Sequence, residues 1–270
     1  MTMRRIISLE SAGMAIVTSI VVVAVLAPWL APHDPTGVAA PTFGDPGFPS
    51  RAFPLGTDDL GRDVLSRIIF GARISLIVGV AAMLMTVSIG VAIGVCSGFF
   101  GGAIDAVLMR FTDMMLALPA LLLAMALVVV LRPSLLTVLL VIGLVSWTQI
   151  ARVVRAETIA MTQRDFVLGA RALGAASGRL IVRHILPNAM PTIVVMAALG
   201  TSGTLLLDAA LSFLGLGVPP PTPSWGRMIE EAAIYFRTAP WLALFPGLAI
   251  FYAVLGFNLL GYGLLRRRAK

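Results

Sequence analysis

The chain has 270 residues, of which 59% are hydrophobic and only 12% are charged, and its mean hydropathy is +0.97. So few polar side chains cannot cover the surface of a soluble globule, which excludes a soluble enzyme and makes a lipid bilayer the expected solvent. The formal net charge is +7. The basic residues stand between apolar runs and not in one aromatic-interleaved patch, which argues against binding of nucleic acid.

Six apolar windows are long enough to cross the hydrocarbon core of a bilayer, which takes about 20 residues each. The sequence therefore predicts an all-α polytopic membrane protein with six transmembrane helices and both termini on one side. A secretory signal could also explain the first window, but no A-x-A cleavage site follows it, so we interpret it as an uncleaved helix. The windows lie at about 11–31, 74–98, 108–131, 135–152, 190–217 and 241–265.

The positions of arginine and lysine orient the helices, because short cytoplasmic loops hold an excess of these residues. With the N terminus inside, more than half of the 20 basic residues fall on the cytoplasmic side. Both termini and the loop at about 155–189 are then predicted to be cytoplasmic. The basic residues on that side are Arg4, Arg5, Arg110, Arg152, Arg155, Arg164, Arg171, Arg179, Arg183, Arg266, Arg267, Arg268 and Lys270.

A segment rich in Pro, Gly and Asp separates the first two windows and is predicted to be extracytoplasmic. We therefore divide the chain into residues 1–70, an N-terminal helix with this segment, and residues 71–270, a core of five helices. Within the segment, Asp58, Asp59 and Arg62 could receive an extracytoplasmic partner. They could equally form an internally paired, capped start of the next helix.

No residue pattern in this chain indicates catalysis or a bound cofactor. The only lysine is Lys270, so the chain lacks the internal lysine that a phosphate-binding loop requires. The single cysteine, Cys96, excludes an intrachain disulfide and a multi-cysteine metal site, and we expect it to be buried as a small apolar residue. The two histidines, His33 and His184, fall on opposite sides of the predicted membrane.

The basic loop near residue 170 has the pattern of two short helices. Thr162 precedes Asp165 in an [ST]-x-x-[DE] spacing, which predicts a capped helix from about Gln163. Phe166, Ala170 and Leu173 then form one apolar stripe, and Gly174 is placed to end the helix. A second segment is predicted to be capped at Ser177 and to end or kink before Pro187.

A short protruding helix that presents Phe166 between arginines suits insertion into a groove of a partner protein. The alternative is an amphipathic connector that lies on anionic lipid through its arginines. Two intramembrane polar residues, Asp208 and Asn258, are candidates for a translocation path, because such residues face the interior or serve function. Asp208 could instead be paired or hydrated within the helix bundle.

The stretch "RDFVLGARALGAASGRLIVRHILPN", residues 164–188, resembles the EAA loop of ABC-importer permeases. Gly174 and the pair Leu186 and Pro187 keep the spacing of that loop, whereas Leu168, Gly169 and Ala170 stand where Glu-Ala-Ala is usual. "ARALGAA" and "RHILPN" are similar to the peptide-permease branch. Residues 55–79 and 211–229 resemble further segments of the second, C-type permease subunit of the dipeptide, oligopeptide and nickel group.

The resemblance implies a permease subunit, itself not an enzyme, that imports peptides across a bacterial cytoplasmic (inner) membrane. It also implies a heterodimer with a sister permease, one or two cytoplasmic ATPases that bind ATP and Mg, and an extracytoplasmic solute-binding protein. A nickel-chelate importer and an ion-gradient-driven secondary transporter are the alternatives. The residues that it assigns to coupling are Asp165, Phe166, Gly169, Ala170, Arg171, Leu173, Gly174, Leu186 and Pro187.

Overall fold

The computed structural model describes residues 3–41 and 44–268, and within these ranges the only strand-like pairing is one bridge between Thr57 and Asp63. The prediction of an all-α protein is thus confirmed. Lys270 and the side chains of Arg4, Arg5 and Arg268, which were expected to be cytoplasmic, lie outside what the structure describes.

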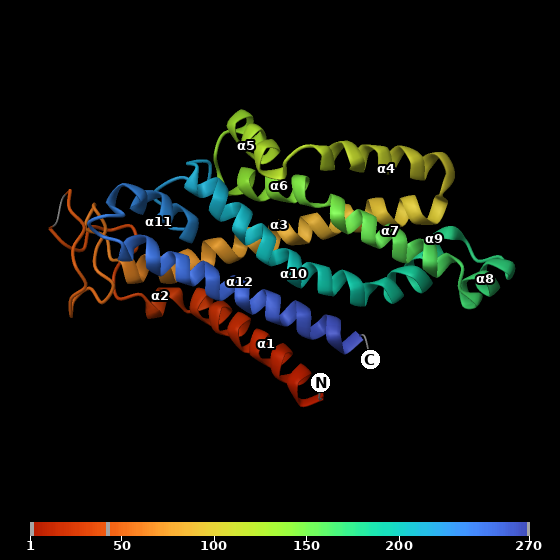
Figure 1. Ribbon diagram of the computed structural model, residues 1–270, viewed down its shortest axis with the longest axis horizontal. Helices are drawn as coiled ribbons and strands as arrows, with labels where there is room; N and C mark the ends of the chain where they lie inside the picture. The colour runs from red at the N-terminus through yellow and green to blue at the C-terminus, as the bar shows by residue number, and fades with distance from the viewer. Residues whose placement is uncertain (1–2, 42–43, 269–270) are drawn as a thin grey trace.

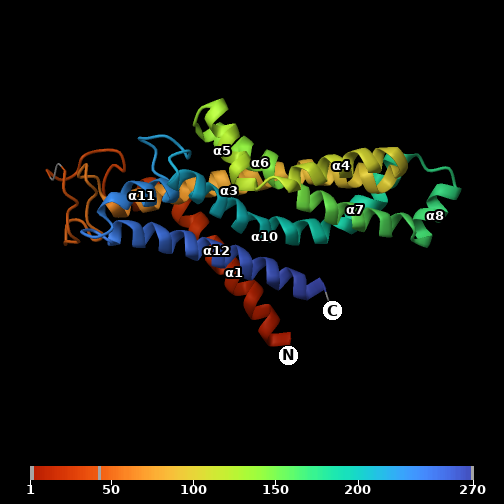
Figure 2. The ribbon, with the colours of Figure 1, turned by 45° about the horizontal axis from the view of Figure 1, so that its top comes forward.

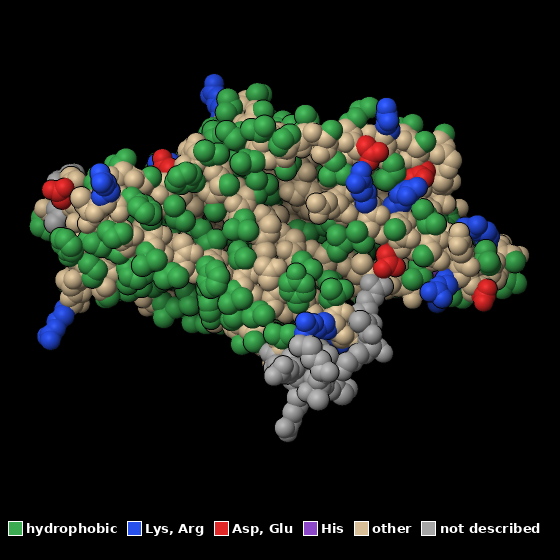
Figure 3. Space-filling view, in the orientation of Figure 1, with side chains coloured by type: hydrophobic (Ala, Val, Ile, Leu, Met, Phe, Trp, Pro, Cys, Tyr) green, Lys and Arg blue, Asp and Glu red, His purple; other side chains and the backbone are tan. Residues whose placement is uncertain are grey.

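The long helices run along one axis, with residues 32–63 and α11 at one end and α8 at the other (Figure 1). Hydrophobic side chains cover most of the middle of the face in Figure 3, whereas charged ones gather mainly toward the α8 end. In chain order the helices are α1 (Met3–Val25), α2 (Ala27–Leu30), α3 (Val64–Phe100), α4 (Gly102–Ala117), α5 (Ala120–Leu131), α6 (Leu135–Ser146), α7 (Thr148–Thr162), α8 (Asp165–Ala172), α9 (Ser177–Leu180), the π-helix η1 (Ile181–Ile185), α10 (Leu186–Phe213), α11 (Trp225–Ala232), the 3₁₀ turn η2 (Ala233–Tyr235) and α12 (Trp241–Arg268).

Three helices, α3, α10 and α12, are each long and apolar enough to cross a membrane. With 37 residues, α3 is about 55 Å long at 1.5 Å per residue. It therefore extends beyond a hydrocarbon core of about 30 Å. This helix begins ten residues before the window predicted at 74–98, because the capped segment ahead of that window is already helical.

Two predicted spans are bent pairs of helices. The window at 108–131 is divided into α4 and α5, which meet at 89°, and the window at 135–152 into α6 and α7, which meet at 43°. Pro119 explains the first bend, because proline moves the preceding Leu118 out of helical geometry, here to ψ 131°. Each window was predicted as one transmembrane helix and instead contains two helices that meet at a bend, and the count of six spans stays an interpretation.

The helix α1 packs along α12 and α3, and Figure 2 shows it crossing beneath α12. Ile20, Ala24, Ile250 and Phe257 form part of the buried cluster that joins these helices. Glu10 near the start of α1 lies 3.4 Å from Arg267 near the end of α12. The described ends of the chain therefore lie close together (Figure 1), which supports the prediction that both termini lie on the same side.

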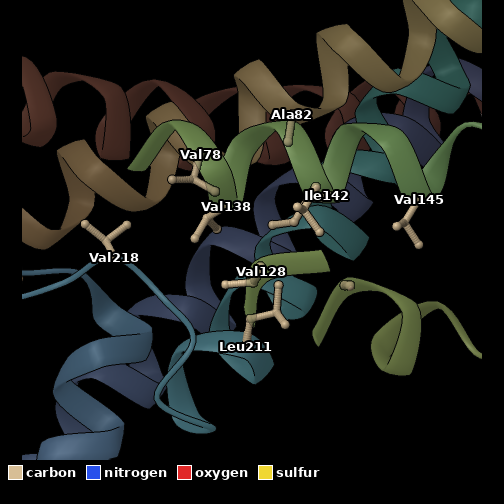
Figure 4. Close-up of a cluster of buried hydrophobic side chains, with 10 residues drawn as sticks. Val78, Ala82, Val128, Val138, Ile142, Val145, Leu211 and Val218 are labelled. Carbon is tan, nitrogen blue, oxygen red and sulfur yellow. The ribbon is translucent and has the colours of Figure 1, made fainter. Parts of the chain in front are cut away.

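A second buried cluster holds α5 and α6 on the central helices. In Figure 4, Val78 of α3, Ile142 of α6, Val128 of α5 and Leu211 of α10 converge on one another, and Val218 closes one edge. Since all five are less than 4% exposed, this cluster fixes the bent arm of α5 against α3 and α10.

Helices α3 and α7 touch through their backbones. Gly90, Gly94 and Gly98 occur at every fourth residue of α3 and face α7. A Cβ atom on Gly94 would lie 2.6 Å from the carbonyl oxygen of Ala151, closer than real contacts allow. Small residues at this spacing permit such close helix packing in membranes, so α7 is held firmly on α3.

Cys96 is exposed on α3, so its predicted burial was wrong. The helix turns Gly94 and Ser97 toward its neighbours, and both of these are buried. Cys96 lies on the other side of the same turn.

Candidate coupling loop and transmembrane cleft

The basic loop connects α7 to α10 and lies at the end of the bundle opposite residues 32–63, the segment predicted to be extracytoplasmic (Figures 1 and 2). It contains α8, a tight turn, α9 and η1. The two predicted short helices are therefore present, and their boundaries differ from those expected.

The helix α8 begins at Asp165 and not at Gln163, and the predicted cap by Thr162 was wrong. Thr162 ends the preceding helix, where its hydroxyl donates to the carbonyl oxygen of Ile159 at 2.7 Å. Arg164 occupies the N-cap position of α8 without a side-chain hydrogen bond. The carboxylate of Asp165 in the first turn still meets the positive end of the helix dipole.

Gly174 ends α8 as predicted. Its φ angle is +80°, its N–H donates to the carbonyl of Arg171 at 3.0 Å, and the N–H of Ala175 donates to that of Ala170 at 3.1 Å. These two bonds define a Schellman motif, which places the residue after the C-cap in a left-handed conformation that glycine adopts without strain.

The inner face of α8 rests on the rest of the chain. Val167 is fully buried, and the guanidinium of Arg171 lies 5.6 Å from the ring centre of Phe99 at the end of α3. Such a cation and ring attract each other electrostatically. The sequence stripe did not reveal Val167, since it lies off the row formed by Phe166, Ala170 and Leu173.

The outer edge of α8 is apolar and uncovered by other parts of the described chain. Phe166 and Leu168 are each 46% exposed, and Leu173 is 90% exposed. The ring centre of Phe166 lies 6.2 Å from that of His184, which borders the same surface. Apolar side chains that gather on a protruding helix among arginines are typical of a surface that contacts another protein or a membrane.

The second predicted segment is not capped by Ser177, and its helix does not end before Pro187. Ser177 is the first helical residue of α9, behind an N-cap at Ala176. The helix continues through η1 into α10, whose first turn contains Leu186 and Pro187. Proline lacks the N–H for an i→i−4 bond, and the backbone ahead of it widens into a π-helix. The side-chain amide of Asn188 donates to the carbonyl of His184 at 2.6 Å.

The two helices that the loop connects, α7 and α10, border one cleft in the membrane-spanning part. The cleft has a volume of about 530 Å³. Thr148 and Gln149, at the start of α7, lie on one side of it, and Met196 and Thr204 of α10 lie on another. Because α7 runs from this cleft to Thr162, three residues before α8 begins, a single helix connects the cleft to α8.

Ion pairs join α4 to α7 at the same end of the bundle. Arg155 donates from Nε and Nη2 to the two carboxylate oxygens of Asp105, each at 2.6 Å, and Arg152 donates to Asp113 at 2.5 Å. Two such parallel bonds fix geometry as well as energy. The spacing of Arg152 and Arg155 on one helix face was the available sequence signal, and the sequence analysis did not use it.

At the opposite end, a largely buried ionic cluster joins residues 32–63 to α3 and α11. Arg67 donates from Nη1 to Asp58 and from Nη2 to Glu231, the latter at 2.6 Å. Arg62 donates to the same two carboxylates at 2.7 and 3.3 Å. Asp58 and Arg62 are thus committed to internal pairing, whereas Asp59 is partly exposed. Contact of these residues with a binding protein stays a prediction.

The N-cap of α3 is Asp63, which directly follows Arg62, the last residue of the predicted helix start. Its carboxylate accepts from the backbone N–H of Ser66 at 3.1 Å and from the Ser66 hydroxyl at 2.6 Å. His33 lies 3.3 Å from the same carboxylate. The extracytoplasmic segment is therefore tied to the start of α3 at two places.

Neither Asp208 nor Asn258 lines the cleft. Asp208 is 2% exposed in α10, and its Oδ1 has no hydrogen-bond partner. The amide of Asn258 donates to the carbonyl of Val254 on its own helix at 2.9 Å. Their role in a translocation path stays a prediction. Within residues 3–41 and 44–268, no group of three or more His, Cys, Asp or Glu side chains is placed to hold a metal ion.

Apolar helices long enough to cross a membrane, a protruding helix α8, and a cleft bordered by α7 and α10 are together typical of a polytopic membrane protein. Residues 90–270 match the family profile described as "Binding-protein-dependent transport system inner membrane component". Residues 11–46 match the "N-terminal TM domain of oligopeptide transport permease C". The chain belongs to the family of inner-membrane components of binding-protein-dependent transport systems.

Several curated relatives are similar along most of the chain. A dipeptide transport system permease protein of Alkalihalophilus pseudofirmus is 41% identical over 93% of this chain and 82% of its own length. An oligopeptide transport system permease protein of Bacillus subtilis is 38% identical, over 95% and 83%. A glutathione transport system permease protein of Escherichia coli is 41% identical, over 91% and 80%. Family membership does not favour the ion-gradient-driven alternative.

Proposed function

We propose that this chain is the C-type permease subunit of an ATP-driven importer of dipeptides or oligopeptides. It acts with a sister permease, an extracytoplasmic solute-binding protein, and one or two cytoplasmic ATPases that bind and hydrolyse ATP with Mg. The relatives described above are named for dipeptide, oligopeptide and glutathione transport. Amide-linked amino acids are common to these three cargo classes, which favours a peptide over a nickel chelate.

The observation that carries the coupling proposal is the uncovered apolar edge of α8, above all Leu173, which is 90% exposed. We assign this edge to a groove of the partner ATPase, with Phe166 and Leu173 as the inserted side chains. Asp165 makes polar contacts at the rim, and the small residues Gly169 and Ala170 allow close approach. Arg171 holds α8 on Phe99.

A movement of α8 is transmitted to the cleft through α7 and α10, the two helices that flank the loop. The backbone contact at Gly94 holds α7 on α3, and the Arg155 pair holds α7 on α4, so these helices move together. Leu186 and Pro187 begin α10, the other flanking helix. Closure of the ATPases on ATP then shifts the population between inward-open and outward-open arrangements, and binding and hydrolysis of ATP by the partners supply the energy of the cycle.

Leu173→Asp should weaken the association of the ATPase without unfolding the permease, because the leucine is exposed in this chain. In the proposed interface the same leucine is buried against the ATPase. Loss of one such leucine contact costs about 1.5–3 kcal/mol of binding free energy, which corresponds to roughly a 10- to 100-fold weaker Kd. The measurement is titration of the purified ATPase against the permease heterodimer in lipid nanodiscs.

Ala103→Asp is the control for the added charge. Ala103 is exposed in the first turn of α4 at the same end of the bundle, where a carboxylate suits the helix dipole. This variant should bind the ATPase as the unsubstituted protein does. Equal Kd values for the two variants would contradict the assignment of α8 to the ATPase groove.

A further inference from the structure

The intramembrane cleft lies at the middle of the bundle. Met83 and Thr86 border it near the midpoint of α3, and Gly200 and Gly203 border it near the midpoint of α10. It also meets both helix bends: Leu118 and Ala120 flank the break between α4 and α5, and Ser146 and Thr148 flank that between α6 and α7. Irregular backbone at membrane depth is tolerated where it is buried in protein or lines a water-filled cavity.

The lining of the cleft is mainly apolar, with several uncharged polar side chains. Its polar side chains are hydroxyls and one carboxamide, and much of the remaining surface is thioether and small aliphatic groups. Among the described residues that border the cleft, none carries a charge. They are Met83, Thr86, Met115, Leu116, Leu118, Ala120, Val145, Ser146, Thr148, Gln149, Ile150, Met196, Leu199, Gly200, Gly203 and Thr204.

The exposure of Gln149 favours a cleft that holds water over one that is filled by lipid. Its side chain is exposed, whereas the hydroxyls of Thr204 and Thr86 already donate within the protein, to the carbonyls of Gly79 at 2.9 Å and Gly143 at 3.4 Å. Placing an exposed carboxamide in hydrocarbon costs several kcal/mol if it finds no partner, so polar residues at this depth face the interior or an aqueous cavity.

We propose that this cleft is the surface over which the peptide passes in this subunit, and that Gln149 sets its neutrality toward cargo charge. The inference rests on the proposed peptide function. Thioether side chains adapt to varied shapes, and hydroxyl and carboxamide groups bond the peptide backbone that every cargo shares. A lining without charge lets acidic and basic peptides pass alike. Gln149 also stands at the start of α7, whose far end leads to α8, so coupling acts directly on this surface.

Cysteine labelling of the full transport complex tests whether the cleft is aqueous. In a Cys96→Ser background, Gln149→Cys and Ser146→Cys are each treated with a membrane-impermeant cationic thiol reagent in inside-out and right-side-out vesicles. Both should react from at least one side. Leu144→Cys, on the exposed side of α6 away from the cleft, and Val128→Cys, in the buried core, should not react. Absence of labelling at both 146 and 149 in a complex that transports would overturn the proposal.

Charge substitution at the same position tests the passage itself. Gln149→Lys should lower the uptake of Lys-Ala relative to Asp-Ala by roughly tenfold, and Gln149→Glu should reverse the preference, since the effective dielectric beside a protein wall is below that of bulk water and like charges a few ångströms apart still repel there. Uptake of dialanine should change little. An unchanged ratio in both variants would overturn the role of Gln149. Labelling at position 149 together with no uptake of any peptide by the unsubstituted complex would instead overturn the proposed peptide function.

Discussion

Gly174→Val should reduce ATP-driven uptake by roughly 30-fold or more while leaving the protein inserted in the membrane. Position 174 has φ +80°, where a residue with a Cβ atom costs about 1–2 kcal/mol and a β-branched one costs more. At a cost of about 2 kcal/mol, roughly one molecule in thirty keeps the native turn that follows α8. The remaining molecules would present Phe166 and Leu173 at other angles. Uptake into proteoliposomes and membrane abundance are the two measurements.

Gly174→Asn is the matched control, because asparagine tolerates the left-handed conformation far better than valine. It should retain most of the uptake. Because no atom lies within 4 Å of a Cβ at this position, neither side chain clashes with its surroundings, and the two variants differ only in their backbone preference. Equal uptake by the Val and Asn variants would show that the bend at Gly174 does not matter for coupling.

Arg67→Ala should destabilise the α11 end of the protein by about 3–5 kcal/mol, since it leaves the buried Asp58 and the partly buried Glu231 with Arg62 as their shared remaining partner. The Arg67 side chain is only 2% exposed and contacts both carboxylates. The expected fall in the thermal inactivation midpoint of the purified complex is on the order of 10 °C.

Arg73→Ala provides the comparison, because Arg73 lies less than two turns further along α3 and is exposed. Its removal should change the midpoint by only a degree or two, as is usual for surface charges. Similar midpoints for the two variants would mean that the cluster of Asp58, Arg62, Arg67 and Glu231 does not stabilise the fold.

Composition and apolar window length were enough to predict the fold class, because a membrane-spanning chain must satisfy its backbone within helices. The end of α8 was also predictable, since Gly174 is a local signal for a local bond pattern. The start of α8 was not, because Thr162 has two bonding choices and donates to Ile159 in the preceding helix. Hydroxyl side chains often make this choice between cap and helix.

The features that place the cleft arise from contacts between distant segments. Gly94 meets Ala151, and Arg155 meets Asp105, but neither pair is signalled by local periodicity. The bend near Ser146 likewise carries no proline signal like that of Pro119. Polarity alone pointed to Asp208, whereas Gln149, an uncharged residue in an apolar window, lines the cleft. Which polar residues share a cavity depends on helix packing, and a single sequence does not specify that packing.

The central claim is that α8 enters a groove of an ATP-hydrolysing partner, and a photo-crosslinking measurement tests it most directly. A photoreactive phenylalanine analogue replaces Leu173 in the complex within native membranes, and crosslinked partners are identified by mass spectrometry. Phe213, exposed at the opposite end of α10, is the control site. We predict that position 173 crosslinks to a P-loop ATPase and that position 213 does not. Crosslinking of position 173 to lipid alone, in membranes from which that ATPase co-purifies with the permease, would contradict the account.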